Sequence, residues 1–205
     1  MGSFPTLVLA SASPQRRAIL ERLGVVFQLR PTHVAEIERG EPGEVAVQNA
    51  LRKARAACAS SPAAETAGPS GDASEIVLGC DTLVALDGRI YGKPADEREA
   101  RATLRALSGA THTVLSGLAL LSAAGERVAL ARTEVDFREL GEDSIDWYVT
   151  SGEWRGRAGG YAIQGIGAAL VRAIRGDYEN VVGLPLATLL DMCPNLLMEH
   201  ARDRH

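Results

Sequence analysis

The feature that most constrains this chain is the stretch over residues 77–94, which reads VLGCDTLVALDGRIYGKP. Residues 77–86 have the length and the branched aliphatic content of a buried β-strand. Asp87-Gly88 follows, and this dipeptide predicts a two-residue hairpin turn with a short return strand after it. One acidic residue, Asp81, lies inside the apolar run. The stretch therefore predicts a buried hairpin that carries a carboxylate.

The position of Asp81 within an apolar strand requires an explanation, because an ionised carboxylate without partners is costly to bury. On strict alternation its face also carries Gly79 and Ala85, whose small side chains would leave space beside the carboxylate. A two-residue turn places Lys93 opposite Thr82 and hence near Asp81. One interpretation is a general base or a metal-binding acid in a cleft with a cationic partner. The other is a structural Asp–Lys ion pair at a sheet edge, and these residues leave both open.

Composition narrows the class of protein. The chain has 205 residues, of which 46% are hydrophobic and 23% charged, as is ordinary for a globular protein. A net charge of −4 argues against a nucleic-acid partner. The first ten residues lack a charged region and carry only a short apolar run, and no stretch approaches the length of a membrane span, so we expect neither a signal peptide nor a membrane partner.

The cysteines agree with an intracellular protein. Cys58, Cys80 and Cys193 lack metal-ligand spacing, and an odd number cannot all pair. Cys80 lies in the apolar strand, where we expect it to act as a small core residue. A reducing cytoplasm fits this usage, so the expected localisation is cytoplasmic.

The N-terminal region reads as a strand over residues 6–10, a serine-rich turn and a helix. Ser13 followed by Pro14 is the pattern of a helix N-cap and its first residue, and Gly24 ends the helix. Arg16 and Arg17 lie in the first turn, where a cation opposes the helix dipole by roughly 0.3–1 kcal/mol.

A bound anion would reverse the sign of that effect. Free backbone N–H groups, Ser11, Ser13 and the two arginines could together hold a phosphate, and we favour this interpretation. The alternative is two solvated arginines on an ordinary surface helix.

The remaining elements follow from periodicity and from turn residues. We expect strands over residues 25–29, 111–122, 127–140 and 168–174, and helices over 43–59, 96–107, 142–150 and from 184 onward. The two long strands are expected to join at Ala124-Gly125. Residues 60–74 are expected to form a flexible surface loop, 177–183 another loop, and 202–205 a frayed tail.

Two polar features of this pattern could serve a site. Lys53 lies at the edge of the apolar arc of its helix, where it either snorkels to solvent or reaches an anion in a cleft. The loop over residues 31–43 carries His33, Glu36, Glu38 and Glu41, any of which could reach the site or be merely solvated.

The segment over residues 152–167, GEWRGRAGGYAIQGIG, is rich in glycine, so its backbone must turn sharply or approach something closely. Arg155, Arg157 and Gln164 are interleaved with the glycines and suit a phosphate or a base edge. The alternative is an irregular loop held by Trp154 and Tyr161. The sequence has no GxxxxGK[ST], GxSxG or HExxH motif and no paired Cys-x-x-Cys.

Six motifs, taken in order, resemble one family. They are Ser11-Ala12-Ser13-Pro14-Gln15-Arg16-Arg17, Gly79-Cys80-Asp81-Thr82, Gly92-Lys93-Pro94, Ser108-Gly109-Ala110-Thr111-His112, Ala158-Gly159-Gly160-Tyr161-Ala162-Ile163-Gln164-Gly165 and Asn180-Val181-Val182-Gly183-Leu184-Pro185. Each motif is weak alone, but their order is specific. From about residue 6 to residue 190 the chain resembles the Maf family of nucleotide pyrophosphatases.

The resemblance implies a single Maf-like domain over residues 1–205, with a mixed α/β fold of two lobes around a long bent mixed sheet and a central cleft. It implies hydrolysis of a nucleoside triphosphate to the monophosphate and pyrophosphate, a divalent cation (Mg²⁺ or Mn²⁺), and, by analogy only, a homodimer. The segment over residues 161–165 is similar to the branch that prefers dTTP and UTP.

The resemblance also implies roles for residues. Asp81 matches the proton acceptor for the attacking water, and Glu36 and Asp81 are the expected metal ligands. Thr82 and Gln164 match positions associated with choice of base. The expected substrate-binding residues are Ser11, Ser13, Gln15, Arg16, Lys53, Thr82, Lys93, Arg157 and Gln164.

The chain departs from the family pattern at two places. Gln15 stands where most members have arginine, at a position linked to substrate choice. Gly156-Arg157 stands where Asp-Lys is usual, so a carboxylate is lost while the positive charge is kept in a different shape.

A second hypothesis is a nucleotide-binding regulator of cell division or septum formation that acts through a partner without turnover. Intact Asp81 and Lys93 favour the enzyme, because a pure binder gains nothing from a buried acid that faces a polyanion.

Overall fold

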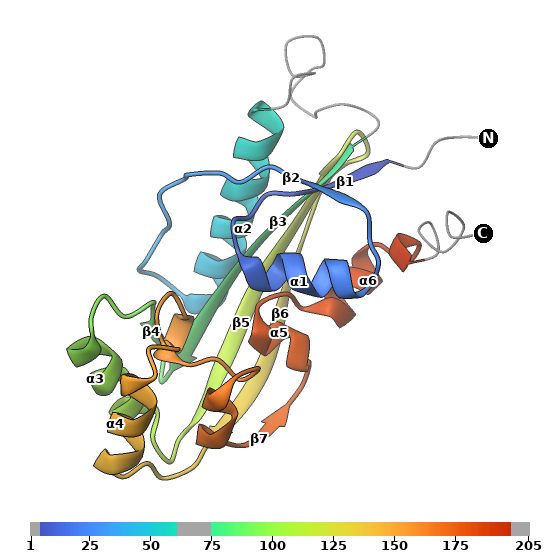
Figure 1. Cartoon of the computed structure of the whole chain (residues 1–205). Coiled ribbons are helices and arrows are strands. Elements are labelled where there is room, and N and C mark those ends of the chain that lie inside the picture. Colours follow the sequence, from blue (N-terminus) through green and yellow to red (C-terminus); the bar gives the residue numbers. More distant parts are fainter. Residues whose placement is uncertain (1–4, 61–74, 198–205) are drawn as a thin grey trace.

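The computed structural model describes residues 5–60 and 75–197, and its centre is a mixed β-sheet (Figure 1). Within these residues the sheet has seven strands in the order β2-β1-β3-β5-β6-β7, with β4 paired to β3 off this path. The strands are β1 (Thr6–Leu9), β2 (Phe27–Leu29), β3 (Glu75–Leu86), β4 (Arg89–Tyr91), β5 (Thr111–Ser122), β6 (Gly125–Phe137) and β7 (Val171–Arg175). β1 is parallel to β2 and β3, and the other pairs are antiparallel. The expected mixed α/β fold is confirmed.

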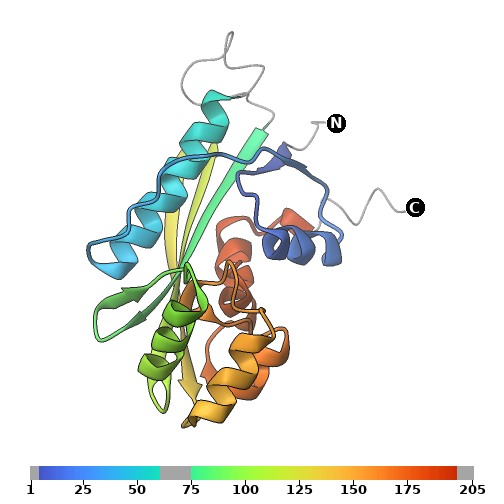
Figure 2. The same cartoon turned by 60° about the vertical axis from the view of Figure 1, so that its left-hand side comes forward.

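Helices cover both faces of this sheet (Figure 2). They are α1 (Pro14–Arg22), α2 (Pro42–Ala59), α3 (Glu97–Leu107), α4 (Glu142–Thr150), α5 (Tyr178–Val182) and α6 (Leu186–Met192). α2 lies along one face over β3 and β5, while α1, α5 and α6 lie on the other. α3 and α4 pack together at the far end of the long strands.

The alternation of β1 shows how the strands serve both faces. Leu7 and Leu9 belong to the hydrophobic cluster under α1 and α6, whereas Val8 and Ala10 belong to the cluster under α2. β3 alternates in the same way, with Leu78 and Cys80 in the first cluster. The expectation that Cys80 is a core residue is confirmed.

Two glycines let α2 lie unusually close to the sheet. A Cβ on Gly79 of β3 would lie 2.1 Å from the carbonyl oxygen of Ala50, and one on Gly117 of β5 would lie 2.2 Å from that of Ala46. The prediction that Gly79 leaves space beside the carboxylate was therefore wrong, because the backbone of α2 fills that space. The close approach instead brings the polar residues of α2 next to Asp81.

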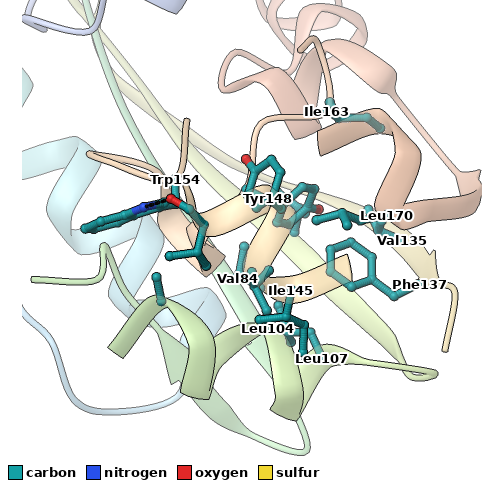
Figure 3. Close-up of a cluster of buried hydrophobic side chains, with 14 residues drawn as sticks. Val84, Leu104, Leu107, Val135, Phe137, Ile145, Tyr148, Trp154, Ile163 and Leu170 are labelled. Carbon is teal, nitrogen blue, oxygen red and sulfur yellow. Dashed lines mark hydrogen bonds between the residues drawn. The ribbon is translucent and has the colours of Figure 1, made fainter. Parts of the chain in front are cut away.

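A second core lies at the other end of the strands (Figure 3). Leu104 and Leu107 of α3 pack with Phe137 of β6 and Tyr148 of α4. Trp154 lies in the same cluster and donates a hydrogen bond from Nε1 to the carbonyl oxygen of Val149 at 3.0 Å. This core anchors the glycine-rich segment, in agreement with the alternative interpretation of a loop held by Trp154 and Tyr161.

The edge of β3 is paired only in part, and the gap positions the site. β1 pairs with β3 as far as Leu78, and β4 pairs with it from Val84 onward. Between them, the edge around Asp81 and Thr82 has neither strand as a partner. The predicted hairpin supplies β4: Asp87 and Gly88 both have positive φ, of 51° and 76°, as a two-residue type I′ turn requires.

Some element boundaries differ from the sequence-based predictions. Residues 177–183 were expected to be a loop, but they contain α5, because Asp177 Oδ1 accepts from the backbone N–H of Glu179 at 2.8 Å and caps it. The strand expected over 168–174 begins at Val171, after a 3₁₀ turn over Ile166–Leu170. β6 begins at Gly125, so Ala123 and Ala124 form the turn.

Other predictions differ from the structure or lie outside the residues that it describes. β6 ends at Phe137 rather than at residue 140, and its register with β7 shifts between Asp136 and Phe137. The loop expected over 60–74 lies almost entirely outside the described residues, and the tail expected over 202–205 lies wholly outside them. Among the described helices, none is both long and apolar enough to cross a membrane.

Candidate active site

A cavity of about 710 Å³ opens at the unpaired edge of β3. That volume is in the range of small-molecule sites. Every residue that the resemblance nominated lines it: Ser11, Ser13, Gln15, Arg16, Glu36, Lys53, Asp81, Thr82, Lys93, Arg157 and Gln164. Arg155, which the glycine-rich segment also offered, does not line it, and its side chain is 62% exposed. The chain thus brings together groups from the α1 end of the molecule and from the glycine-rich segment at the other end.

Asp81 lies at the cavity wall with only 4% of its surface exposed. Its Oδ1 accepts from the ammonium of Lys53 at 2.5 Å, and its Oδ2 accepts from the amide of Asn49 at 3.0 Å. Two donors from α2 therefore compensate its burial. The expected cationic partner was Lys93, but the cation in contact is that of Lys53. Lys93 lines the same cavity.

Lys53 also explains how the loop after β2 reaches the site. Its ammonium donates to Glu36 Oε1 at 2.6 Å as well as to Asp81. The side chain is 12% exposed, so Lys53 reaches an anion in a cleft rather than snorkelling to solvent. Burial alone would raise the pKa of Glu36, but the hydrogen bond from Lys53 and the charges of Lys53, Lys93 and Arg16 lower it below its usual value.

Arg16 connects separate parts of the site through hydrogen bonds. Its guanidinium donates to the carbonyl oxygen of Gly183 at 2.8 Å, to Ser11 Oγ at 2.9 Å and to Thr82 Oγ1 at 3.2 Å. These bonds tie α1 to β3 and to the turn between α5 and α6. Arg16 is 8% exposed and still lines the cavity, so it combines fixed geometry with positive charge.

Arg17 behaves differently from Arg16. Its guanidinium pairs with Glu21 at 2.6 Å on the exposed side of α1, and the side chain is 55% exposed. The interpretation of Arg17 as a phosphate ligand was wrong, and the solvated alternative holds for it.

The predicted N-cap of α1 is confirmed, since Ser13 Oγ accepts from the backbone N–H of Arg16 at 3.5 Å. The same hydroxyl donates to Gln15 Oε1 at 3.1 Å.

The opposite wall of the cavity is mixed in character. It carries Gln164 and Arg157 beside apolar groups, namely Val84, Val114, Tyr161, Val181 and Val182. Among the described residues, Arg157 Nε is buried and has no hydrogen-bond partner.

Tyr161 is held from behind by His112. The Tyr161 hydroxyl lies 2.9 Å from His112 Nε2, and the two rings pack edge to face. Burial lowers the pKa of His112 from 6.5 to about 4, so the imidazole is neutral around pH 7. This pair fixes the position of one aromatic wall.

Few side chains at the site could act as ligands of a divalent cation. No group of three or more His, Cys, Asp or Glu side chains within the described ranges could hold a metal ion. Glu36 and Asp81 both bind the Lys53 ammonium, so their oxygens converge on one point of positive charge. Mg²⁺ is commonly held by one or two carboxylates together with substrate phosphates and water, and this pair fits that mode.

Sequence reasoning missed two groups that support the site. Ser116 of β5 lies opposite Thr82, with 2.8 Å between the two hydroxyl oxygens. Asn49 lies behind Asp81. The signal for Asn49 was present, because it is an amide on the apolar arc of α2 one helical turn before Lys53.

Comparison with known proteins identifies the family of this chain. The family model for "Maf-like protein" matches residues 6–196. A dTTP/UTP pyrophosphatase from Pelotomaculum thermopropionicum is 45% identical, covering 91% of this chain and 94% of the relative. Those from Deinococcus radiodurans and Pyrococcus furiosus are 43% and 41% identical, covering 91% of this chain and 90% and 93% of the relatives. With a family model and full-length relatives in agreement, the chain belongs to the Maf family.

Proposed function

We propose that this protein hydrolyses a nucleoside triphosphate between its α- and β-phosphates. The observation that carries the proposal is Asp81, a buried carboxylate at the wall of a cavity that also carries four basic side chains, Arg16, Lys53, Lys93 and Arg157. A pocket for an uncharged ligand would not need this arrangement. The names of the relatives, dTTP/UTP pyrophosphatases, support the same reaction class.

The chemistry assigned to Asp81 is general base catalysis. Asp81 accepts a proton from a water molecule as the water oxygen bonds to the α-phosphorus. The bond between the α-phosphorus and the bridging oxygen breaks, and pyrophosphate leaves with the electron pair. The nucleoside monophosphate remains, with the new oxygen on its phosphate.

The basic residues supply electrostatic stabilisation. Lys53, Lys93, Arg16 and Arg157 face a substrate whose three phosphates carry most of its charge, and charge stabilisation of this kind dominates phosphoryl transfer. Ser11 and Ser13, at the start of α1, would contribute hydroxyl groups to the phosphates. Arg16 is already held in place by three hydrogen bonds, so this cation is pre-positioned.

Glu36 and Asp81 are the residues that would hold a divalent cation, Mg²⁺ or Mn²⁺. When bound, such an ion neutralises phosphate charge and makes water more acidic. With the cation and the substrate bound, the Lys53 ammonium would donate to phosphate oxygens in place of Glu36 and Asp81.

The substrate that we favour carries a pyrimidine base, as in dTTP and UTP. Thr82 and Gln164 are the proposed polar contacts to the base, and the valines and Tyr161 form the apolar part of the same cavity. Gln15 also lines the cavity and places an amide where the family pattern has an arginine. We also propose a cytoplasmic location, and a homodimer remains a prediction from the resemblance.

The test is a substrate panel. The protein is incubated with dTTP, UTP, CTP, GTP and 7-methyl-GTP, with Mg²⁺ or Mn²⁺, and pyrophosphate and orthophosphate are measured separately. The proposal expects pyrophosphate together with the monophosphate, fastest for dTTP or UTP. Nucleotide binding without turnover across the panel would contradict it and would favour the regulator hypothesis.

A further inference from the structure

Asn49 is a buried amide that lies behind the cavity rather than in it. It is 1% exposed and lies on α2, one turn before Lys53. Residues four apart on a helix share a face, so Asn49 and Lys53 both point at β3. The close packing of α2 on Gly79 brings the two side chains within hydrogen-bond distance of Asp81.

The orientation of the Asn49 amide is fixed by its partners. Asn49 Oδ1 accepts from the backbone N–H of Ile37 at 2.8 Å, and that N–H can only donate. Nδ2 must then face the other two groups, both of which can only accept. It donates to the carbonyl oxygen of Ile37 at 3.0 Å and to Asp81 Oδ2 at 3.0 Å.

These bonds link the proposed base to the loop that carries Glu36. Lys53 binds one oxygen of Asp81 and Asn49 binds the other, so the carboxylate is held at both oxygens. The same amide binds both backbone groups of Ile37, the residue after Glu36. One side chain therefore fixes the carboxylate and the adjoining loop relative to each other.

We propose that Asn49 is a positioning residue for catalysis that acts through Asp81 without touching the substrate. The proposal rests on the proposed function, in which Asp81 is the base. Asn49 holds the Asp81 carboxylate in the orientation that receives the proton from water, and it keeps Glu36 beside Lys53. Its loss should therefore lower kcat and leave substrate binding nearly unchanged.

The experiment compares Asn49→Leu, which has similar volume and no amide, with the exposed neighbour Gln48→Leu as the matched control. Wild-type pyrophosphate release from dTTP is measured first. We expect Asn49→Leu to lower kcat roughly 10- to 100-fold with KM changed less than about threefold. Gln48→Leu should keep the wild-type kcat. Should Asn49→Leu fail to fold, Asn49→Thr removes the amide with less added apolar surface.

A double-mutant cycle separates positioning from a general structural effect. Once Asp81→Asn has removed the base, adding Asn49→Leu should change the remaining rate less than about threefold. Independent multiplication of the two losses would overturn the proposal, and so would a wild-type kcat in Asn49→Leu.

Hydrogen exchange gives a readout that does not depend on turnover. The Ile37 amide should exchange faster in Asn49→Leu than in the wild-type protein or in Gln48→Leu. Unchanged exchange would overturn the link to the loop. A wild-type protein that releases no pyrophosphate would instead overturn the proposed function, so the two failures are distinguishable.

Discussion

The ammonium of Lys53 on α2 lies 2.5 Å from Oδ1 of Asp81 on β3, and the two side chains are 12% and 6% exposed. Removing one partner of a buried pair leaves the other charge uncompensated, which typically costs about 3–5 kcal/mol. We therefore expect Lys53→Met to lower both the free energy of unfolding and the rate. A loss of roughly 10²- to 10³-fold in kcat is the scale for one electrostatic group.

The measurement for Lys53 is pyrophosphate release together with thermal unfolding. Arg55→Met is the control, because Arg55 lies on the same helix in an exposed pair with Glu126. Exposed pairs contribute little, so this control should stay within about 1 kcal/mol of the wild type. Equal effects of the two substitutions would contradict the role given to Lys53.

The two adjacent arginines of α1 provide a second test. Arg16→Met removes three hydrogen bonds that join α1, β3 and the turn at Gly183, so we expect kcat/KM to fall by roughly 10²-fold or more. Arg17→Met removes only an exposed pair with Glu21 and should leave kcat/KM within about twofold. Steady-state kinetics with dTTP decides, and a larger loss for Arg17→Met would show that the assignment is reversed.

Gly79→Ala tests the close packing of α2 on the sheet. The added methyl group would lie 2.1 Å from the carbonyl oxygen of Ala50, so helix and sheet must separate. We expect a loss of about 1–3 kcal/mol or more in the free energy of unfolding, and a lower kcat because Asn49 and Lys53 move with the helix. Gly141→Ala is the control, since nothing lies within 4 Å of its added methyl group. Denaturant unfolding with equal midpoints for both variants would refute the packing argument.

His112 predicts how stability depends on pH. Burial lowers its pKa from 6.5 to about 4, a difference worth about 3 kcal/mol. Above pH 6.5 neither the folded nor the unfolded state binds the proton, so the full stability is present. Between pH 6.5 and 4 the histidine of the unfolded state takes up the proton first. The free energy of unfolding therefore falls as the pH is lowered through this range.

The measurement is the free energy of unfolding at several pH values for the wild type, His112→Gln and His33→Gln. His33 is exposed and serves as the control. The decline over this pH range should be shallower in His112→Gln and unchanged in His33→Gln. A wild-type slope in His112→Gln would contradict the prediction.

Local chemistry made much of this structure predictable. Asp87-Gly88 fixed the hairpin, Ser13-Pro14 and Gly24 bounded α1, and alternation placed Asp81 within a buried strand. These signals depend on neighbours in sequence, so reading the chain recovers them. The resemblance then nominated cavity residues from six separate segments, and all of them line the cavity.

What could not be predicted depends on contacts between distant segments. The partner of Asp81 is Lys53 rather than the hairpin lysine, because Gly79 and Gly117 admit α2 to the sheet. An amide on the apolar arc of α2 was a signal for Asn49, but its partners, Ile37 and Asp81, lie in other segments, so the sequence does not show what it binds. Arg16 and Arg17 likewise differ in their partners: Arg16 binds Gly183 and Thr82 in distant segments, whereas Arg17 binds Glu21 on its own helix.

The most direct test of the account is Asp81→Asn, which keeps the shape of the side chain and removes its ability to accept a proton. Pyrophosphate release from dTTP should fall by roughly 10²- to 10⁴-fold. Binding of a non-hydrolysable α,β-methylene analogue should remain close to that of the wild type. The variant should still unfold cooperatively, but at a lower temperature, because Lys53 loses its charged partner. An Asp81→Asn protein that releases pyrophosphate at the wild-type rate would contradict the claim that this buried carboxylate activates the attacking water.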